Sequence, residues 1–169
     1  LDSSIPILVF IENNAASAGA LISIAADSIY MKEGARIGAA SVVNQQGEIM
    51  PEKYQSYMRS TMRATAEAQG KDTLMENGKQ VVRWRRDPRI AEAMVDPRIA
   101  IAGVVDSTQL IAFTTQEAIQ NGYCEGKAEN IDEVFKRADI VNARVEEYEI
   151  TQMEKVIGFL ISPALQGIL

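Results

Sequence analysis

The chain has 169 residues, of which 47% are apolar and 24% are charged, a composition typical of a globular domain and not of a disordered segment. It contains no histidine and a single cysteine, Cys124, which excludes Ser-His-Asp and Cys-His catalysis, histidine-based metal sites and an intrachain disulfide. The net charge of −6 argues against a nucleic-acid partner. Hydrolytic chemistry would have to use Ser, Thr, Lys, Asp or Glu, and we expect neither a metal nor a cofactor.

The first part of the chain predicts a strand, a turn and a buried helix. Residues 5–11 form a short apolar run rich in β-forming residues, which indicates a buried strand. Residues 12–14 form a polar turn, and residues 15–26 are small and apolar on every side, as in a helix that is buried all round. Two further short strands are predicted at residues 28–31 and 39–43, on either side of a glycine-containing loop.

The longest predicted helix covers residues 52–69, where Tyr and Met recur at helical spacing as far as Gly70. Residues 71–87 are hydrophilic and are interpreted as an insertion. Residues 88–95, which begin with a proline, predict a short helix.

The second half of the chain predicts more strands and two capped helices. Residues 99–105 and 110–113 are predicted as a strand pair around a turn. Capping boxes at residues 114–117 and 130–133 indicate the starts of two helices. A further strand is predicted at residues 140–145.

Strands alternate with helices along the chain, which predicts an α/β fold with a largely parallel sheet. Residues 153–169 carry an amphipathic pattern interrupted by Pro163, so we expect a main domain at residues 1–152 and an amphipathic helix at residues 153–169. The chain begins at Leu1 and ends within an apolar stretch, and we expect it to be a piece of a longer protein.

The sharpest chemical signal is the strand-turn-helix sequence around Ser17. Ser17 lies in a small-x-Ser-x-Gly pattern from Ala15 to Gly19, a relaxed form of the nucleophile elbow. Small neighbours would let a substrate backbone approach the hydroxyl, and the free N–H of Ala18 at the helix start would stabilise an oxyanion. Serine is also a preferred helix N-cap, so the pattern alone leaves a purely structural role open. Asn14 precedes this turn and is a candidate for binding substrate backbone, or simply a turn former.

Without histidine, Ser17 would need a lysine or a carboxylate as its general base, and a lysine acts as a base only when it is desolvated. Lys53 is the best placed lysine, because it follows Pro51 in the first turn of the long helix, where a positive charge is slightly unfavourable. The alternative is a solvated first-turn lysine. Asp27 and Glu33 are weaker candidates, since both are expected to be solvated.

Basic side chains concentrate between residues 79 and 98, around Trp84. This segment could engage anionic headgroups or a partner, cover the active site as a lid, or form an ordinary solvated face. Its members are Lys79, Arg83, Arg85, Arg86, Arg89 and Arg98. Cys124 is expected to be a buried structural thiol.

The segment from Glu12 to Ile22 resembles the nucleophile segment of the NfeD-type, ClpP-class membrane-bound serine proteases, the stomatin operon partners. The similarity continues through residues 29–31, 37–40 and 50–53. Residues 115–123 resemble the late helix-turn of the wider ClpP/crotonase superfamily. The resemblance implies a ClpP/crotonase-like superhelix of repeated ββα units.

The same resemblance implies a serine nucleophile and a lysine general base, which are Ser17 and Lys53 here, with the Ala18 N–H as an oxyanion donor. Asn14 and Gly38 are added as candidate substrate-binding residues. The family's glycine-rich loop, which supplies a second oxyanion donor upstream, is not present in this sequence. We therefore expect residues 1–152 to be an N-terminally incomplete protease domain.

The function expected from the resemblance is that of a serine endopeptidase that cleaves apolar, extended segments of membrane-associated proteins. It further implies a homo-oligomer, a stomatin/prohibitin-type membrane partner and a soluble domain on the extracytoplasmic side of a membrane. The amphipathic helix at residues 153–169 would then be membrane-proximal, because it resembles the stretch that leads to the family's membrane spans. Two alternatives stay open. One is a catalytically weak scaffold of the same fold that binds such a partner, and the other is an acyl-CoA enzyme of the crotonase class.

Overall fold

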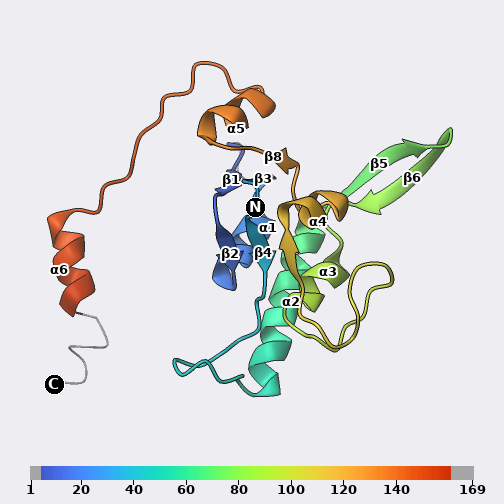
Figure 1. Cartoon of the computed structure of the whole chain (residues 1–169), viewed down its shortest axis with the longest axis horizontal. Coiled ribbons are helices and arrows are strands. Elements are labelled where there is room, and N and C mark those ends of the chain that lie inside the picture. The colour runs from blue at the N-terminus through green and yellow to red at the C-terminus, as the bar shows by residue number, and fades with distance from the viewer. Residues whose placement is uncertain (1–4, 161–169) are drawn as a thin grey trace. The chain divides into compact units, whose positions relative to one another are not determined.

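The computed structural model of the protein describes residues 5–160, without the side chains of residues 76, 156, 159 and 160 (Figure 1). The chain divides into two units, Leu1–Asp139 and Ile140–Leu169. The first unit holds the sheets and most of the helices. The predicted boundary between residues 152 and 153 stays a prediction.

The amino-terminal apolar run forms one strand of a parallel sheet. β1 (Leu8–Ile11) pairs with β3 (Ser28–Met31), which also pairs with β8 (Gly126–Lys127). Leu8 lies opposite Ser28 and Ile11 lies opposite Met31. The strand predicted at residues 5–11 is therefore confirmed in its second half, and the strand predicted at residues 28–31 is confirmed at both ends.

A second small sheet lies directly after the first in the chain. β2 (Asn14–Ala16) pairs in parallel with β4 (Arg36–Gly38), and β4 pairs antiparallel with β7 (Ala112–Thr114). The strand predicted at residues 39–43 is wrong, because the strand in this region, β4, starts three residues earlier and ends at Gly38. Gly38 has a φ of 134° and Ala39 a φ of 46°, so the chain leaves the extended conformation at this point and the apolar residues that follow cannot continue the strand.

Three helices follow the strands of these sheets. α1 (Ala18–Ala25) connects β2 to β3 and packs against α2 (Glu52–Ala68), which in turn packs against α3 (Pro88–Ala93). The prediction that the first helix is buried on all sides is wrong, because Ile22 is 66% exposed. The long helix is confirmed, and it buries Met62 and Ala66 against the rest of the unit.

Two helices in the second half begin at the predicted caps. α4 (Thr115–Gln120) starts with a complete capping box between Thr114 and Glu117. α5 (Ile131–Arg137) starts at Asn130, whose side chain accepts a hydrogen bond from the Glu133 N–H. Between them Cys124 is buried, and its burial raises the pKa of its thiol to about 11, as expected for a structural thiol.

The hydrophilic insertion is a β-hairpin and not an irregular loop. β5 (Lys71–Glu76) and β6 (Lys79–Trp84) pair antiparallel along their whole length and project from the body of the first unit (Figure 1). Asn77 and Gly78 form the two-residue turn, and both have positive φ, as a type I′ turn requires. This Asn-Gly pair was the sequence signal for the hairpin.

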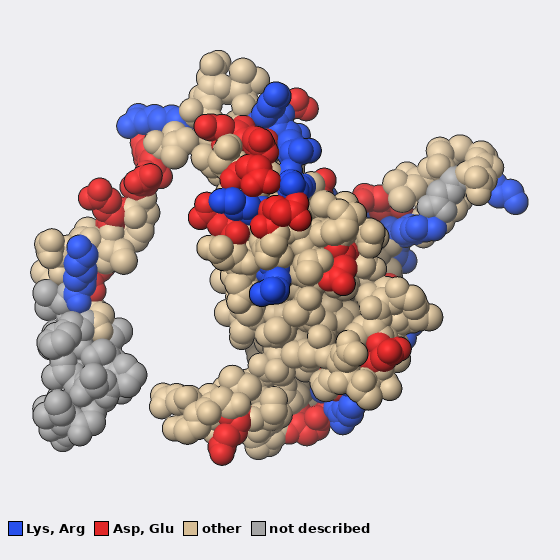
Figure 2. Space-filling model, viewed as in Figure 1, with Lys and Arg blue, Asp and Glu red and all other residues tan. Residues whose placement is uncertain are grey.

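The basic segment does not form a continuous surface. Arg86 is fully buried and donates to the carbonyl oxygens of Ile24 and Ala26 at the end of α1, at 3.1 and 2.7 Å. Arg85 donates to the Asp27 carbonyl oxygen. Figure 2 shows Lys and Arg side chains scattered among acidic ones on the face in view. The interpretation as a headgroup-binding patch is therefore not supported, and the solvated-face interpretation is wrong for Arg86.

Two further predicted strands are absent from the described residues. Residues 99–111 form a loop with one isolated bridge between Ile101 and Val105, so the predicted strand pair is wrong apart from β7. Residues 140–145 are irregular although they contain β-branched side chains. Val141 and Val145 are exposed there, and neither is paired in a strand among the described residues.

The second unit contains α6 (Gln152–Leu160), on which Met153 and Ile157 are exposed. This confirms a helix in the first part of the predicted amphipathic segment. The rest of that segment, residues 161–169 with Pro163, lies outside the described residues. Across residues 5–160, no helix combines the length and the apolar character that a membrane span needs.

Candidate functional site

Ser17 occupies a sharp corner between the end of β2 and the start of α1. Its backbone has a φ of 54° and a ψ of −120°, a conformation that glycine adopts readily and other residues rarely do. The Ser17 N–H donates to the carbonyl oxygens of Gly38 and Ala39, at 3.2 and 3.3 Å. The Ser17 carbonyl accepts from the Ala20 and Leu21 N–H groups of the first helical turn. Both sides of the corner are thus held by hydrogen bonds, and this holds Ser17 in its unfavourable conformation.

The hydroxyl of Ser17 is not used as a helix cap. Ser17 occupies the N-cap position of α1, yet its side chain makes no capping hydrogen bond and the residue is exposed. A capping serine has extended backbone dihedrals and accepts from an N–H of the first turn. The Ser17 side chain therefore does not act as a helix cap, which was the structural role that the sequence left open.

Two backbone donors lie next to this hydroxyl. The N–H groups of Ala18 and Gly19 open α1 and have no acceptor among the described residues. The first N–H groups of a helix carry partial positive charge and are suited to stabilising an oxyanion. The arrangement combines an exposed hydroxyl, a strained corner and free N–H donors, which is the arrangement of a nucleophile elbow.

The strain at Ser17 gives a prediction about stability. Replacement of Ser17 by glycine and by alanine removes the hydroxyl equally, but only glycine relieves the positive φ. We expect Ser17→Gly to be more stable than Ser17→Ala by about 1 kcal/mol. Urea unfolding of the two variants measures this difference, and a glycine variant less stable than the alanine one would contradict the strained corner.

Gly38 is buried and supports the corner from the neighbouring strand. A Cβ at this position would lie 2.4 Å from the backbone oxygen of Ile111, so no side chain fits. The Ala39 N–H donates to the same Ile111 oxygen at 2.8 Å, and the Gly38 carbonyl accepts from Ser17. Gly38 therefore fixes the backbone beneath Ser17, while its predicted contact with substrate stays a prediction.

Asn14 lies on β2, on the outer side of the second sheet. β2 is paired only through β4, with Asn14 opposite Arg36, so its other edge is free of partners among the described residues. Asn14 is exposed. An extended peptide could pair with such an edge.

Lys53 is the second residue of α2 and is exposed to solvent. Its ammonium group lies 5.2 Å from the centroid of the Tyr54 ring. Within the described part of the chain, no hydrogen bond or ion pair joins Lys53 to Ser17 or to a carboxylate. The burial that a lysine base requires is not provided by this chain alone, and the Ser17–Lys53 pairing stays a prediction.

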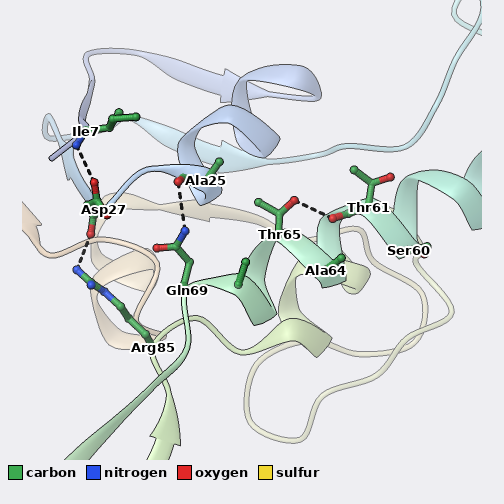
Figure 3. A pocket seen from close by; sticks show the side chains of 10 residues that line it. Ile7, Ala25, Asp27, Ser60, Thr61, Ala64, Thr65, Gln69 and Arg85 are labelled. Carbon is green, nitrogen blue, oxygen red and sulfur yellow. Dashed lines mark hydrogen bonds between the residues drawn. The ribbon is translucent and has the colours of Figure 1, made fainter. Parts of the chain in front are cut away.

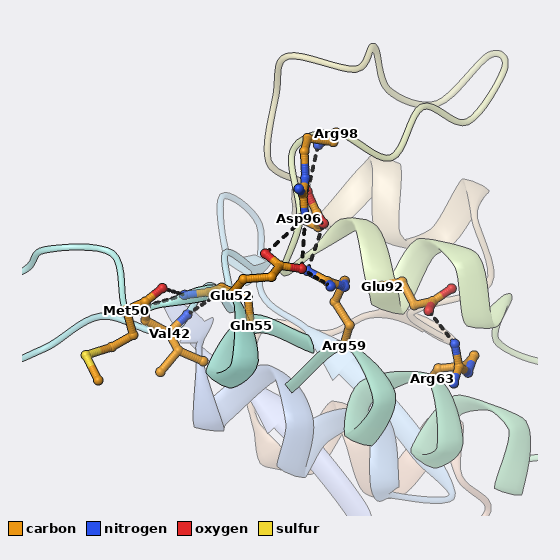
Figure 4. Close-up of polar contacts among 9 residues, drawn as sticks. All are labelled: Val42, Met50, Glu52, Gln55, Arg59, Arg63, Glu92, Asp96 and Arg98. Carbon is orange, nitrogen blue, oxygen red and sulfur yellow. Dashed lines mark hydrogen bonds and ion pairs between the residues drawn. The ribbon is translucent and has the colours of Figure 1, made fainter. Parts of the chain in front are cut away.

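A group of charged residues that sequence reasoning missed surrounds the first turn of α2 (Figure 4). Arg59 bridges Glu52 at 2.5 Å and Asp96 at 2.8 Å, and Arg98 contacts Asp96 at 2.6 Å and Glu52 at 3.2 Å. The Asp96 side chain is only 7% exposed. Hydrogen bonding from Arg98 lowers the pKa of Asp96 to about 2. Hydrogen bonding from Arg59 likewise lowers the pKa of Glu52.

The depressed pKa of Asp96 predicts a contribution to acid stability. Because the folded pKa lies below the unfolded one, the contribution is complete above about pH 4 and is lost as the pH falls through about 2. Its size is about 2 kcal/mol. Asp96→Asn should be less stable than the parent at pH 6 and approach it near pH 2, in urea unfolding at several pH values. Asp106→Asn, at an exposed position, should follow the parent throughout; a constant Asp96→Asn deficit would contradict this prediction.

Two hollows lie at opposite ends of the first unit's helices. One, of about 310 Å³, adjoins the charged group, and its lining combines apolar residues with polar and charged ones: Ile49, Val95, Pro97 and Leu110 with Ser41, Glu52, Gln55, Arg59, Asp96 and Arg98. The other, of about 570 Å³, lies at the carboxyl end of α1, away from Ser17 (Figure 3). Its polar groups are already engaged, since Asp27 accepts from the Ile7 N–H at 2.7 Å and Gln69 donates to the Ala25 carbonyl at 3.2 Å.

Across residues 5–160, no group of three or more Cys, Asp or Glu side chains is arranged to hold a metal ion.

Comparison with known proteins gives a consistent set of relatives. Residues 1–148 match the protein family described as NfeD1b, N-terminal domain. The chain is 32% identical over 169 residues to the membrane protein NfeD1b of Bacillus subtilis (strain 168), which covers 99% of this chain and 35% of that protein. The chain thus spans about a third of the length of this curated relative.

Solved structures of a protease have the same fold. A lysine-to-alanine mutant of the 1510-N membrane-bound stomatin-specific protease, in complex with a substrate peptide, superposes with a TM-score of 0.66 at 21% identity, over 92% of this chain and 70% of that one. A serine-to-alanine mutant gives 0.57 at 23% identity, over 79% and 55%. The 1510-N membrane protease specific for a stomatin homolog from Pyrococcus horikoshii gives 0.55 at 20% identity, over 95% and 70%. These likenesses establish the fold alone.

Proposed function

The chain belongs to the NfeD1b N-terminal domain family, and from this premise we propose that it is the protease domain of a membrane-associated serine endopeptidase with a Ser17–Lys53 dyad. The observation that carries the proposal is the strained corner at Ser17, with its uncapped hydroxyl and the free Ala18 N–H. Strain of this kind persists where function requires it. The fold is shared with a protease whose solved mutants replace a serine and a lysine by alanine, which supports the same pair of residue types here.

In the proposed mechanism the Ser17 Oγ attacks the scissile carbonyl carbon while the neutral Lys53 amine accepts the hydroxyl proton. The Ala18 N–H donates to the oxyanion that forms. Collapse of the tetrahedral intermediate breaks the C–N bond, and Lys53 returns the proton to the leaving amine. Water, deprotonated by Lys53, then hydrolyses the acyl-enzyme.

The exposure of Lys53 fits a substrate that is itself apolar. An apolar peptide lying over the amine would exclude water and favour the neutral form that a general base requires. We propose that an extended apolar segment pairs along the free edge of β2 at Asn14 and covers Lys53. The hollow lined by Ile49, Val95 and Leu110 would take one of its side chains.

The remaining proposals concern the superhelix, the oligomer, the location and the substrate, and they follow from membership of the family. We propose a ClpP/crotonase-like superhelix, supported by two consecutive ββα units, β1-β2-α1 and β3-β4-α2, whose first strands lie in one sheet and whose second strands lie in the other. We also propose a homo-oligomer on the extracytoplasmic side of a membrane. Its protein substrate would be of the stomatin type, a class named in the descriptions of the solved proteases.

The test is a cleavage assay with the folded domain. Twenty-residue peptides that carry an apolar stretch and matched peptides with that stretch replaced by Ser, Glu and Lys are incubated with the protein, and products are identified by mass spectrometry. Cleavage within the apolar stretch, absent with Ser17→Ala, supports the proposal. Cleavage that persists with Ser17→Ala, or no cleavage of any peptide by the full-length protein in lipid vesicles, would overturn it.

A further inference from the structure

Gln55, which sequence reasoning did not single out, is the buried polar side chain of α2. We infer that Gln55 is a positioning residue that sets the separation between Ser17 and Lys53; this inference rests on the proposed function. Gln55 is 6% exposed, and the other buried side chains of the helix, Met62 and Ala66, are apolar. An apolar residue would fill the same space without the penalty of burying an amide.

The carboxamide of Gln55 is fully engaged with backbone (Figure 4). Its Nε2 donates to the Val42 carbonyl at 2.6 Å and to the Met50 carbonyl at 3.1 Å, and its Oε1 accepts from the Val42 N–H at 3.0 Å. The amide therefore pairs with Val42 in both directions, as a neighbouring strand would. Such paired hydrogen bonds fix the orientation of the Gln55 amide as well as its distance from Val42.

These bonds connect the two halves of the proposed dyad. Val42 lies three residues after Ala39, whose carbonyl accepts from the Ser17 N–H. Gln55 lies two residues after Lys53, in the same helical start. The connector between them is closed on itself by the bridge between Val43 and Ile49 and by the bond from the Met50 N–H to the Val42 carbonyl. Gln55 attaches this closed connector to α2.

The attachment matters because, among the described residues, the Lys53 ammonium group has no hydrogen bond or ion pair and contacts only the ring of its neighbour Tyr54. The place of its amine is set by where the first turn of α2 begins, and that turn is held against the Ser17 side of the unit through Gln55. A shift of about 1 Å in a reacting group can lower a rate by about 100-fold. Gln55 also borders the hollow proposed for a substrate side chain, and a methionine there would keep an apolar lining. Loss of the Gln55 bonds should therefore reduce catalysis far more than it reduces substrate binding.

The first experiment compares Gln55→Met with Gln69→Met in the cleavage assay. Gln69 is a matched control, because it lies on the same helix about 21 Å further along and its amide also donates to a backbone carbonyl, that of Ala25. We expect Gln55→Met to lower kcat by about 10- to 100-fold with KM nearly unchanged, and Gln69→Met to change kcat less than about twofold. In a Lys53→Ala background Gln55→Met should have no further effect, since it acts through Lys53.

The second experiment measures the separation without using activity. The double variant Ser17→Cys/Lys53→Cys is treated with a short bis-maleimide, and the rate of intramolecular cross-linking is followed by mass spectrometry; the native Cys124 is buried. Adding Gln55→Met should lower that rate at least about threefold, and adding Gln69→Met should not, given the reach of a short cross-linker. Equal rates in all three proteins would overturn the inference. If Ser17→Ala still cleaves peptides while Gln55→Met alone slows cross-linking, the proposed function fails and the positioning role stands.

Discussion

Ser17→Ala is expected to lower kcat for an apolar peptide by at least about 1,000-fold while leaving KM within about twofold. In the proposed mechanism the hydroxyl is the attacking group, so its loss would remove the covalent route, whereas the substrate would still meet the β2 edge and the hollow beside Ile49. Lys53→Ala should lower kcat by a similar factor. The measurement is steady-state kinetics on the peptide found in the cleavage assay.

The combination of the two substitutions distinguishes a dyad from two separate effects. Residues that act as one unit are strongly non-additive, so Ser17→Ala/Lys53→Ala should be no slower than the slower single variant. Ser107→Ala and Lys136→Ala replace the same residue types at exposed positions and should keep parental rates. Multiplication of the two single effects in the double variant would argue against a shared mechanism.

Local signals in the sequence predicted the parts of the fold that short segments determine. The helix at residues 52–68 has a long apolar periodicity, the caps at Thr114 and Asn130 are formed within four residues, and the strand at 28–31 is a compact apolar run. The hairpin at residues 71–84 was missed because its strands are largely polar and solvated. Its Asn77-Gly78 turn was the one local clue.

The strands predicted at residues 39–43 and 140–145 are wrong for reasons that cannot be read from a local sequence pattern. Residues 39–43 are small side chains followed by two β-branched valines, yet Gly38 and Ala39 turn the backbone away before these residues can extend β4. Residues 140–145 have the composition of a strand, but none of them is paired in a sheet among the described residues. Strand formation depends on a partner, and partners are set by tertiary structure.

The candidate site was likewise predictable only where a short segment of sequence determines it. Ser17 could be found because a nucleophile elbow is a local motif, and the structure shows its strained backbone. The contacts around α2 could not be found, because the partners of Gln55 and Arg59 come from segments up to 37 residues away in sequence. The desolvation of Lys53 that the proposed mechanism requires is shown neither by the sequence nor by the described residues, where Lys53 is exposed.

Gly38→Ala should be the most destabilising of the substitutions considered, by at least about 3 kcal/mol. The added methyl group would lie 2.4 Å from the Ile111 backbone oxygen, and this oxygen directly precedes β7 and accepts from the Ala39 N–H, so it cannot move aside as a flexible side chain would. The residue also has a φ of 134°, which alanine adopts poorly. Urea unfolding at neutral pH measures the loss.

Gly47→Ala is the matched control, because it separates the steric clash at position 38 from the cost of placing alanine at a positive φ. Gly47 also has a positive φ, of 81°, but a Cβ there meets nothing within 4 Å, so Gly47→Ala should cost only about 1 kcal/mol. Equal losses of stability in Gly38→Ala and Gly47→Ala would contradict the close approach of Ile111 to β4. In that case the Gly38 carbonyl would not be held beneath the Ser17 N–H, and the support proposed for the strained corner would have to come from elsewhere in the fold.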